Sequence, residues 1–249
     1  MRPFVLAGIT FVLTLGGIWL GTLLRHTLPR HHLNEDAKDV VRLGVSLIAA
    51  IAALVLGLLI GAAKGSFDTQ TTQVNQITAN LILLDRVLEQ YGPDARPIRV
   101  HMREVVGRFA DQIWREKEMT ATGPFQTDAA AEQLYAEIYK LSPQNDVQRS
   151  LQSRAMQVIN DLAQVRFLLF AESEDLIPTP FLAVVAFWLV IVFASYSMFS
   201  PLNLTLFTSL SLFAFSAACA IFLILELGRP FTGLMRVSSM PLRNALGTL

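Results

Sequence analysis

The 249-residue sequence is poor in the features that mark enzymes and nucleic-acid-binding proteins. It has one cysteine, Cys219, so no intramolecular disulfide can form, and we expect this residue to serve in packing. Its 20 basic and 20 acidic residues cancel, which excludes the basic surface of a nucleic-acid-binding protein. The sequence contains no Gly-x-Ser-x-Gly, phosphate-binding loop or His-Glu-x-x-His motif. We therefore expect neither catalysis nor a cofactor.

Apolar residues, in contrast, are abundant and gather in four long runs. The chain is 53% hydrophobic with a mean hydropathy of +0.46, and the runs cover residues 4–24, 43–63, 181–199 and 204–227. A helix of roughly 20 apolar residues crosses about 30 Å of hydrocarbon. We predict an all-α polytopic membrane protein with two spans in residues 1–63, a polar helical bundle in 64–178, two spans in 179–227 and a C-terminal segment, 228–249. The first run is longer than the apolar core of a signal peptide, which favours a retained helix.

Charge predicts the orientation of these spans. Four spans place both termini and the segment 64–178 on the same side of the membrane. Close to the span ends, that side has six Lys and Arg residues, and the loop between the first two spans has four. The positive-inside rule then places both termini and the polar bundle in the cytoplasm. Only residues 200–203 join the last two spans, which predicts that these are antiparallel neighbours.

The polar middle segment shows helical periodicity throughout. The first helix is expected to continue from span two and to end at Gly92-Pro93, and a second runs from about Pro97 to Glu118. Thr127 is positioned to cap a short third helix, and a long fourth helix leads back to span three. The apolar positions predicted to face the bundle core are Phe67, Val74, Ile77, Leu81, Leu84, Leu88 and Tyr91; Ile98, Met102, Val105, Phe109 and Ile113; Leu134, Ile138 and Leu141; and Val147, Leu151, Ala155, Val158, Leu162, Val165 and Leu169.

Span two carries two patterns with functional interpretations. Small residues recur every fourth position, which predicts close helix packing or, alternatively, a pore-facing stripe. Another face carries large aliphatic residues that suit an apolar constriction in a channel, or contact with lipid or another span. The small-residue stripe is Ala49, Ala53, Gly57, Gly61 and Gly65, and the aliphatic neck candidates are Leu47, Ile51, Leu54 and Leu58.

Polar residues near the spans supply the remaining candidates. Thr69, Thr72, Gln73 and Gln76 belong to an uncharged polar stretch that suits a wet vestibule or an ordinary solvated helix surface. Glu226 ends the fourth run, and a carboxylate there needs a partner. Arg229, three residues later, is the predicted partner, and a role in an ion path is the alternative.

Two clusters of acidic or histidine residues are interpreted without a bound metal ion. The first loop contains His26, His31 and His32 with Glu35, Asp36 and Asp39, but the spacing is nonspecific, and a solvated loop without metal is expected. Glu172, Glu174 and Asp175 precede span three, where acidic residues favour the start of a helix; a cation clasp is the alternative.

Three segments carry a family resemblance: residues 54–64 (LVLGLLIGAAK), residues 83–86 (LLDR) followed by Tyr91-Gly92-Pro93, and most specifically residues 225–242 (LELGRPFTGLMRVSSMPL). Together with the layout of spans, they resemble the bacterial bestrophin-like membrane proteins over nearly the whole chain. That family is named for its similarity to bestrophins, all-α pentameric anion channels with an apolar neck on the second transmembrane helix.

The resemblance implies a multi-pass protein of the bacterial cytoplasmic membrane that assembles as a pentamer. It makes Ile51, Leu54 and Leu58 candidates for the neck, although animal bestrophins have aromatic residues there. Residues 228–249 contain no Asp or Glu, so the acidic calcium clasp of the animal channels has no counterpart and calcium gating is not expected.

Two functional hypotheses follow. The leading one is a homo-oligomeric ion channel or pore-like protein, with span two around the axis and an anion as one candidate permeant ion. The alternative is a nonconducting membrane scaffold whose cytoplasmic bundle docks an unidentified protein partner. A ring with a water-filled axis favours the first hypothesis, and a compact dimer without an axial path favours the second.

Overall fold

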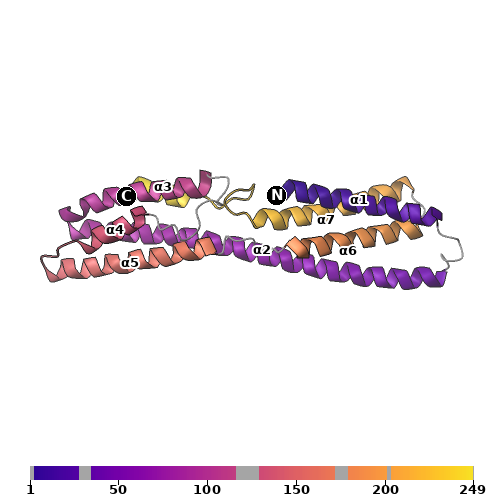
Figure 1. Cartoon of the computed structure of the whole chain (residues 1–249), viewed down its shortest axis with the longest axis horizontal. Coiled ribbons are helices and arrows are strands. Elements are labelled where there is room, and N and C mark those ends of the chain that lie inside the picture. The colour runs from indigo at the N-terminus through magenta and orange to yellow at the C-terminus, as the bar shows by residue number, and fades with distance from the viewer. Residues whose placement is uncertain (1–2, 28–34, 116–128, 172–178, 201–202, 249) are drawn as a thin grey trace. The chain divides into compact units, whose positions relative to one another are not determined.

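The computed structural model describes residues 3–27, 35–115, 129–171, 179–200 and 203–248. All regular elements in these ranges are helical, as predicted (Figure 1). They are α1 (Pro3–Thr27), α2 (Glu35–Tyr91), the short 3-10 helix η2 (Pro93–Ala95), α3 (Arg96–Arg115), α4 (Ala129–Tyr139), α5 (Asp146–Ala171), α6 (Thr179–Phe199), α7 (Leu204–Leu227) and α8 (Met240–Thr248). Four of them, α1, α2, α6 and α7, are long and apolar enough to cross a membrane, which confirms the four predicted apolar helices.

The chain divides into two compact units. The span unit comprises Met1–Gly65 and Asp175–Gly228, and the bundle unit comprises Ser66–Glu174 and Arg229–Leu249. Helix α2 contributes residues to both units, because its 57 residues form one helix that ends at Tyr91. The predicted continuation of span two and its end before Gly92-Pro93 are therefore confirmed.

In the span unit, α1, α6 and α7 lie alongside one another (Figure 1). Helix α1 packs against both α6 and α7, more extensively than those two helices pack against each other. The buried cluster draws residues from all three helices, and α2 adds partly buried residues at its edge. Its members are Ile18, Val185, Leu189, Phe193, Leu210, Ala214 and Ile221, with Val55, Leu56 and Leu59 of α2 packed against them.

Two glycines explain why α1 and α6 approach so closely. A Cβ atom placed on Gly17 would lie 2.9 Å from the carbonyl oxygen of Val190, and one on Gly21 would overlap the carbonyl oxygen of Ala194. One hydrogen bond then joins the helices, because the Ser197 hydroxyl donates to the Ile18 carbonyl at 2.6 Å. Small residues four apart are a known device for close packing of helices in lipid. The sequence interpretation overlooked this pair and selected the α2 stripe instead.

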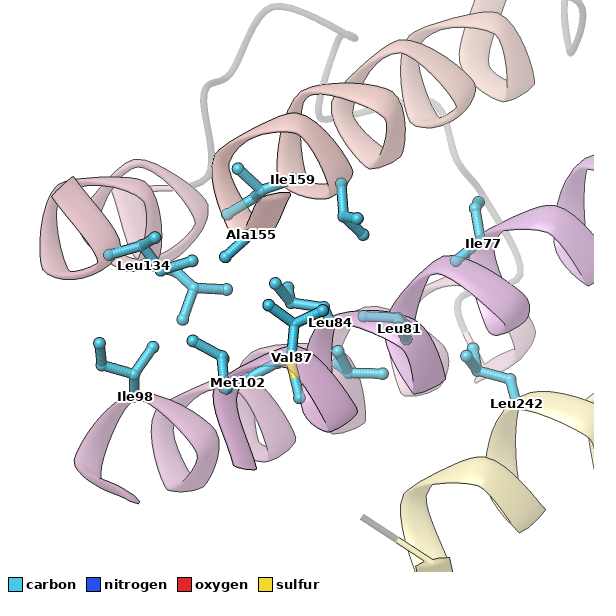
Figure 2. Packing of buried hydrophobic residues seen from close by; sticks show 14 of the residues in the cluster. Ile77, Leu81, Leu84, Val87, Ile98, Met102, Leu134, Ala155, Ile159 and Leu242 are labelled. Carbon is cyan, nitrogen blue, oxygen red and sulfur yellow. The ribbon is translucent and has the colours of Figure 1, made fainter. Parts of the chain in front are cut away.

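In the bundle unit, large apolar side chains from α2, α3, α4 and α5 form the core (Figure 2). Figure 2 shows Leu134 and Ile159, from α4 and α5, facing Leu84 and Val87 of α2. Every predicted core position on α2 is buried or packs against this core. The predicted positions on α3 and α4 are likewise buried or partly buried, except that the side chain of Ile113 lies outside the described residues.

One predicted core position is wrong. Val147 is 68% exposed, whereas Ala155, Val158 and Leu169 further along α5 are buried. Val147 is the second residue of α5, which begins at Asp146, so the prediction extended the apolar face into a first turn that the core does not cover. The predicted Thr127 cap and the end of the second helix at Glu118 lie outside the described residues.

A buried ion pair and a tight turn connect α2 to α3. Arg99 donates two hydrogen bonds to Asp85, from Nε to Oδ1 at 2.6 Å and from Nη2 to Oδ2 at 2.7 Å. The Asp85 side chain is only 3% exposed, and its hydrogen bonds raise the pKa of Arg99 above the ordinary value. Between the helices, Gly92 has φ +119°, a conformation that a residue with a Cβ rarely adopts. The chain can therefore reverse within a few residues.

The C-terminal segment belongs to the bundle core, a position that sequence analysis had not assigned to it. Phe231, Val237 and Leu242 are buried in the cluster. Trp114 of α3 holds this segment in two ways: its indole N–H donates to the Val237 carbonyl at 2.9 Å, and its ring contacts that of Phe231 edge-on at 5.8 Å. The apolar residues of the C-terminal segment thus pack against helices of the protein's own bundle.

Candidate functional site

The four aliphatic neck candidates lie together on an exposed face of α2. Leu47, Ile51, Leu54 and Leu58 are between 40% and 66% exposed. Their spacing of four, three and four residues places them on one side of the helix. The described part of the span unit therefore covers these side chains only in part.

The opposite side of α2 packs against its own chain. Val45, Ala52 and Ala63 are buried, and Val55 and Leu56 are among the residues at the edge of the span-unit cluster. Even so, α2 is the least enclosed of the four spans. In the most apolar 18-residue stretch of α2, 11% of residues are buried, compared with 33%, 28% and 39% in the corresponding stretches of α1, α6 and α7. The described part of the chain therefore leaves most of the α2 surface available to lipid or to another chain.

The small-residue stripe lies on the open surface of α2. Gly57, Gly61 and Gly65 are exposed, and a Cβ added to any of them would meet no atom within 4 Å. Ala53 is also exposed, and Ala49 is half-buried. Among the described residues, the stripe therefore does not bring another helix of the same chain close to α2, unlike Gly17 and Gly21 of α1.

The four vestibule candidates divide between two sides of α2. Thr69, Thr72 and Gln76 are exposed, whereas Gln73 is 5% exposed and lies on the buried side. The Thr72 hydroxyl donates to the Asp68 carbonyl at 2.9 Å, which leaves its oxygen able to accept a hydrogen bond. Three of the four side chains thus present polar groups to solvent in the bundle unit.

Glu226 is 2% exposed at the end of α7, and Arg229 is half-buried just beyond Gly228. Both residues take part in a hydrogen bond or another polar or electrostatic interaction, so the buried Glu226 has a partner. The pairing of Glu226 with Arg229 stays a prediction.

The remaining polar clusters contribute no described site. His31, His32, Glu172, Glu174 and Asp175 lie outside the described residues. Within the described ranges, no group of three or more His, Cys, Asp or Glu side chains is arranged to hold a metal ion.

Residues 54–64, the first segment of the family resemblance, lie in the span unit and include Leu54 and Leu58. The other two segments have structural roles in the bundle unit. Asp85 of the LLDR segment forms the buried ion pair with Arg99, and Gly92 makes the turn. The carbonyl of Tyr91 accepts a hydrogen bond from Gln148 Nε2 at 3.1 Å, which connects α2 to α5. The C-terminal segment supplies Phe231 and several other core residues. These motifs therefore stabilise the fold, and the exposed α2 face is the remaining candidate for function.

Comparison with known families gives one match. The model of the Bestrophin-like domain matches residues 10–242, which is nearly the whole chain. No curated protein and no solved structure matches this protein.

Proposed function

The chain belongs to the bestrophin-like family, and from that premise we propose that it forms a homo-oligomeric ion-conducting pore with α2 around the central axis. The pore lies in the bacterial cytoplasmic membrane, with both termini and the bundle unit in the cytoplasm. Anions are the first ions to test, because bestrophins conduct anions. The family is channel-like rather than enzymatic, and the proposal includes no catalytic step.

The observation that carries the proposal is the exposed aliphatic face of α2. Leu54 and Leu58 point away from the cluster that their own chain forms, while Val55 and Leu56 pack toward it. A helix that anchors one side to its protomer and leaves an aliphatic side open suits the wall of an oligomeric pore. There, aliphatic side chains from several subunits form a constriction that gates by dewetting.

The glycines of α2 support the same arrangement. Successive residues of an α-helix are about 100° apart, so Gly57 and Gly61 lie on the flank of the face that carries Leu58. In a ring, side chains that face the axis are flanked by surfaces that contact neighbouring subunits. The open space around both glycines would admit a neighbouring helix at short distance.

The polar residues further along α2 continue the spacing of the neck. The positions on the neck side of α2 follow steps of three, four and seven residues, as expected for one side of a helix. They are residues 47, 51, 54, 58, 65, 69, 72 and 76. Along this series the side chains change from aliphatic to small and then to uncharged polar. We propose that Thr69, Thr72 and Gln76 line a wet vestibule next to the neck, with Gln73 excluded because it is buried.

The first test is ion flux from liposomes that contain the purified full-length protein, with chloride, potassium and sodium gradients compared and protein-free vesicles as the baseline. Selective flux that depends on the protein would support a pore. Cross-linking and mass measurement of the same preparation give the subunit number, for which the family resemblance predicts five.

Substitutions then separate a neck from a lipid-facing surface. Ile51→Ala and Leu54→Ala widen the proposed constriction and should raise flux severalfold without dissociating the oligomer. Leu212→Ala on α7 is the matched control, because Leu212 and Leu54 are both 64% exposed. Unchanged flux in both α2 variants would remove these residues from the conduction path. A stable assembly without an axial path and without flux would favour the nonconducting scaffold.

A further inference from the structure

A cavity of about 250 Å³ lies in the bundle unit between α2, α3, α4 and α5. Its wall is mainly apolar, with Ile77 and Leu81 from α2, Phe109 from α3, Leu134 from α4, and Ile159 and Leu162 from α5. Ile77, Leu81, Leu134 and Ile159 are seen in Figure 2 on the helices that surround this space. The lining residues Asn160, Ala163 and Phe167 are exposed, so the cavity opens to the surface along α5.

One cationic side chain lines this cavity. Arg166 is half-buried and lies within one helical turn of Ala163 and Phe167. Among the described residues it forms no hydrogen bond or ion pair. A guanidinium that is partly removed from water and lacks a partner gains most from a ligand with a carboxylate, to which it can donate two hydrogen bonds.

The size of the cavity limits the apolar part of such a ligand. A dry protein cavity of about 150 Å³ accepts the six carbons of benzene, so 250 Å³ accepts about ten carbons in proportion. We propose that this cavity binds a medium-chain carboxylate amphiphile, with the acyl chain between the four helices and the carboxylate on Arg166. This site is separate from the α2 face and does not depend on ion conduction.

Glu132, Tyr135 and Asn160 are the other lining residues that carry polar groups, and all three are exposed. Glu132 offers a cationic amphiphile an alternative partner. Because Glu132 is already well solvated, a ligand that pairs with it replaces contacts with water and gains little. Arg166 is the less solvated of the two charged groups, which favours an anionic head group.

The test uses the full-length protein in nanodiscs of zwitterionic lipid. Decanoate, decanol and decyltrimethylammonium are titrated calorimetrically, and the heats from empty nanodiscs are subtracted. Decanoate should bind once per chain and about tenfold more tightly than decanol, because only the carboxylate forms charge-assisted hydrogen bonds. Hydrogen exchange should slow on decanoate binding in residues 105–109 and 159–167, which line the cavity.

Variants separate recognition of the ligand's carboxylate from recognition of its acyl chain. Arg166→Gln should lower decanoate affinity about tenfold, to that of decanol, and leave decanol binding unchanged. Unchanged decanol binding also shows that the cavity is intact in this variant. Arg154→Gln is the matched control on α5: Arg154 is exposed, donates only to Gln157 at 2.8 Å and does not line the cavity. Ala163→Phe narrows the opening and should weaken both ligands.

Several results would overturn the proposal. They are no binding of decanoate, equal affinity for decanoate and decanol, preference for decyltrimethylammonium, or protection outside the cavity-lining segments. Loss of ion flux would not bear on it, since flux and decanoate binding are measured separately.

Discussion

The span unit and the bundle unit pack their helices by different means. In the span unit, Gly17 and Gly21 let the backbones of α1 and α6 touch, and Ser197 adds a hydrogen bond. In the bundle unit, large apolar side chains fill the space between helices, and a buried ion pair joins α2 to α3. Exclusion from water drives the second kind of packing, whereas lipid tails are as apolar as leucine, so helices within them must gain contact by close approach.

The largest effect is expected from breaking the buried ion pair of the bundle unit. Asp85→Ala leaves the Arg99 guanidinium, which is only 20% exposed, without its bidentate partner and should cost about 3–5 kcal/mol of unfolding free energy. Chemical denaturation of the full-length protein in micelles measures this loss. Arg149→Ala, which removes an exposed pair with Asp146, is the control and should cost less than about 1 kcal/mol.

A double substitution tests whether the unpaired charge of Arg99 causes this loss of stability. Asp85→Leu combined with Arg99→Met removes both charges and should recover most of the lost stability, because apolar residues of similar size often replace a buried pair without cost. Equal losses in the double and single variants would show that the charges are not the cause.

The next largest effect is expected at the glycine contact of the span unit. Gly21→Ala places a methyl group against the Ala194 carbonyl and should destabilise the protein by about 3 kcal/mol, since backbone must move. Gly16→Ala adds the same methyl group to the same helix in open space and should be neutral or stabilise by up to about 1 kcal/mol. Thermal unfolding in lipid nanodiscs compares the two variants, and equal melting temperatures would contradict the packing argument.

A smaller effect is expected from the hydrogen bond between α1 and α6. Ser197→Ala removes the donor to the Ile18 carbonyl and should cost about 0.6 kcal/mol, the typical value for a hydrogen bond between helices in a membrane. The same thermal measurement applies. Ser195→Ala serves as control, because the Ser195 hydroxyl bonds only within its own helix, to the Ile191 carbonyl at 2.8 Å.

The smallest effect on the protomer is expected at the glycines of α2. Gly61→Leu adds a large side chain where no atom lies within 4 Å and should leave the fold of the protomer unchanged. If subunits contact one another at this stripe, the oligomer should dissociate, which cross-linking and mass photometry detect. Gly16→Leu is the matched control in α1, with equally open surroundings. An oligomer that survives Gly61→Leu would place the subunit contact elsewhere.

Periodicity in the sequence predicted the helices better than it predicted their partners. The core residues of α2 in the bundle unit, from Val74 to Tyr91, follow a spacing of three and four and were identified correctly. Val147 matched the same pattern on α5 and is nevertheless exposed. Spacing shows which side of a helix is apolar, but only neighbouring helices decide how far along that side the core extends.

The small residues also show that a sequence pattern does not identify the helix that will pack against it. The five-membered α2 stripe was predicted as a surface for close helix packing, and the two-membered α1 motif was overlooked. In the protomer the shorter motif makes the contact, and Gly57, Gly61 and Gly65 are open. A glycine permits close approach without requiring it, and the partner surface, here Val190 and Ala194 of α6, is not encoded in the motif.

The sequence by itself determined the all-helical class, the four apolar spans, the end of α2 at Gly92 and the resemblance to the bestrophin-like family, because length, apolar periodicity and turn residues are local properties of the chain. Only the tertiary structure decided that α1 pairs closely with α6, that the C-terminal segment enters the bundle core, and that a cavity forms beside Arg166. Each of these depends on surfaces that are distant in sequence, and their complementarity exists only once the helices have packed.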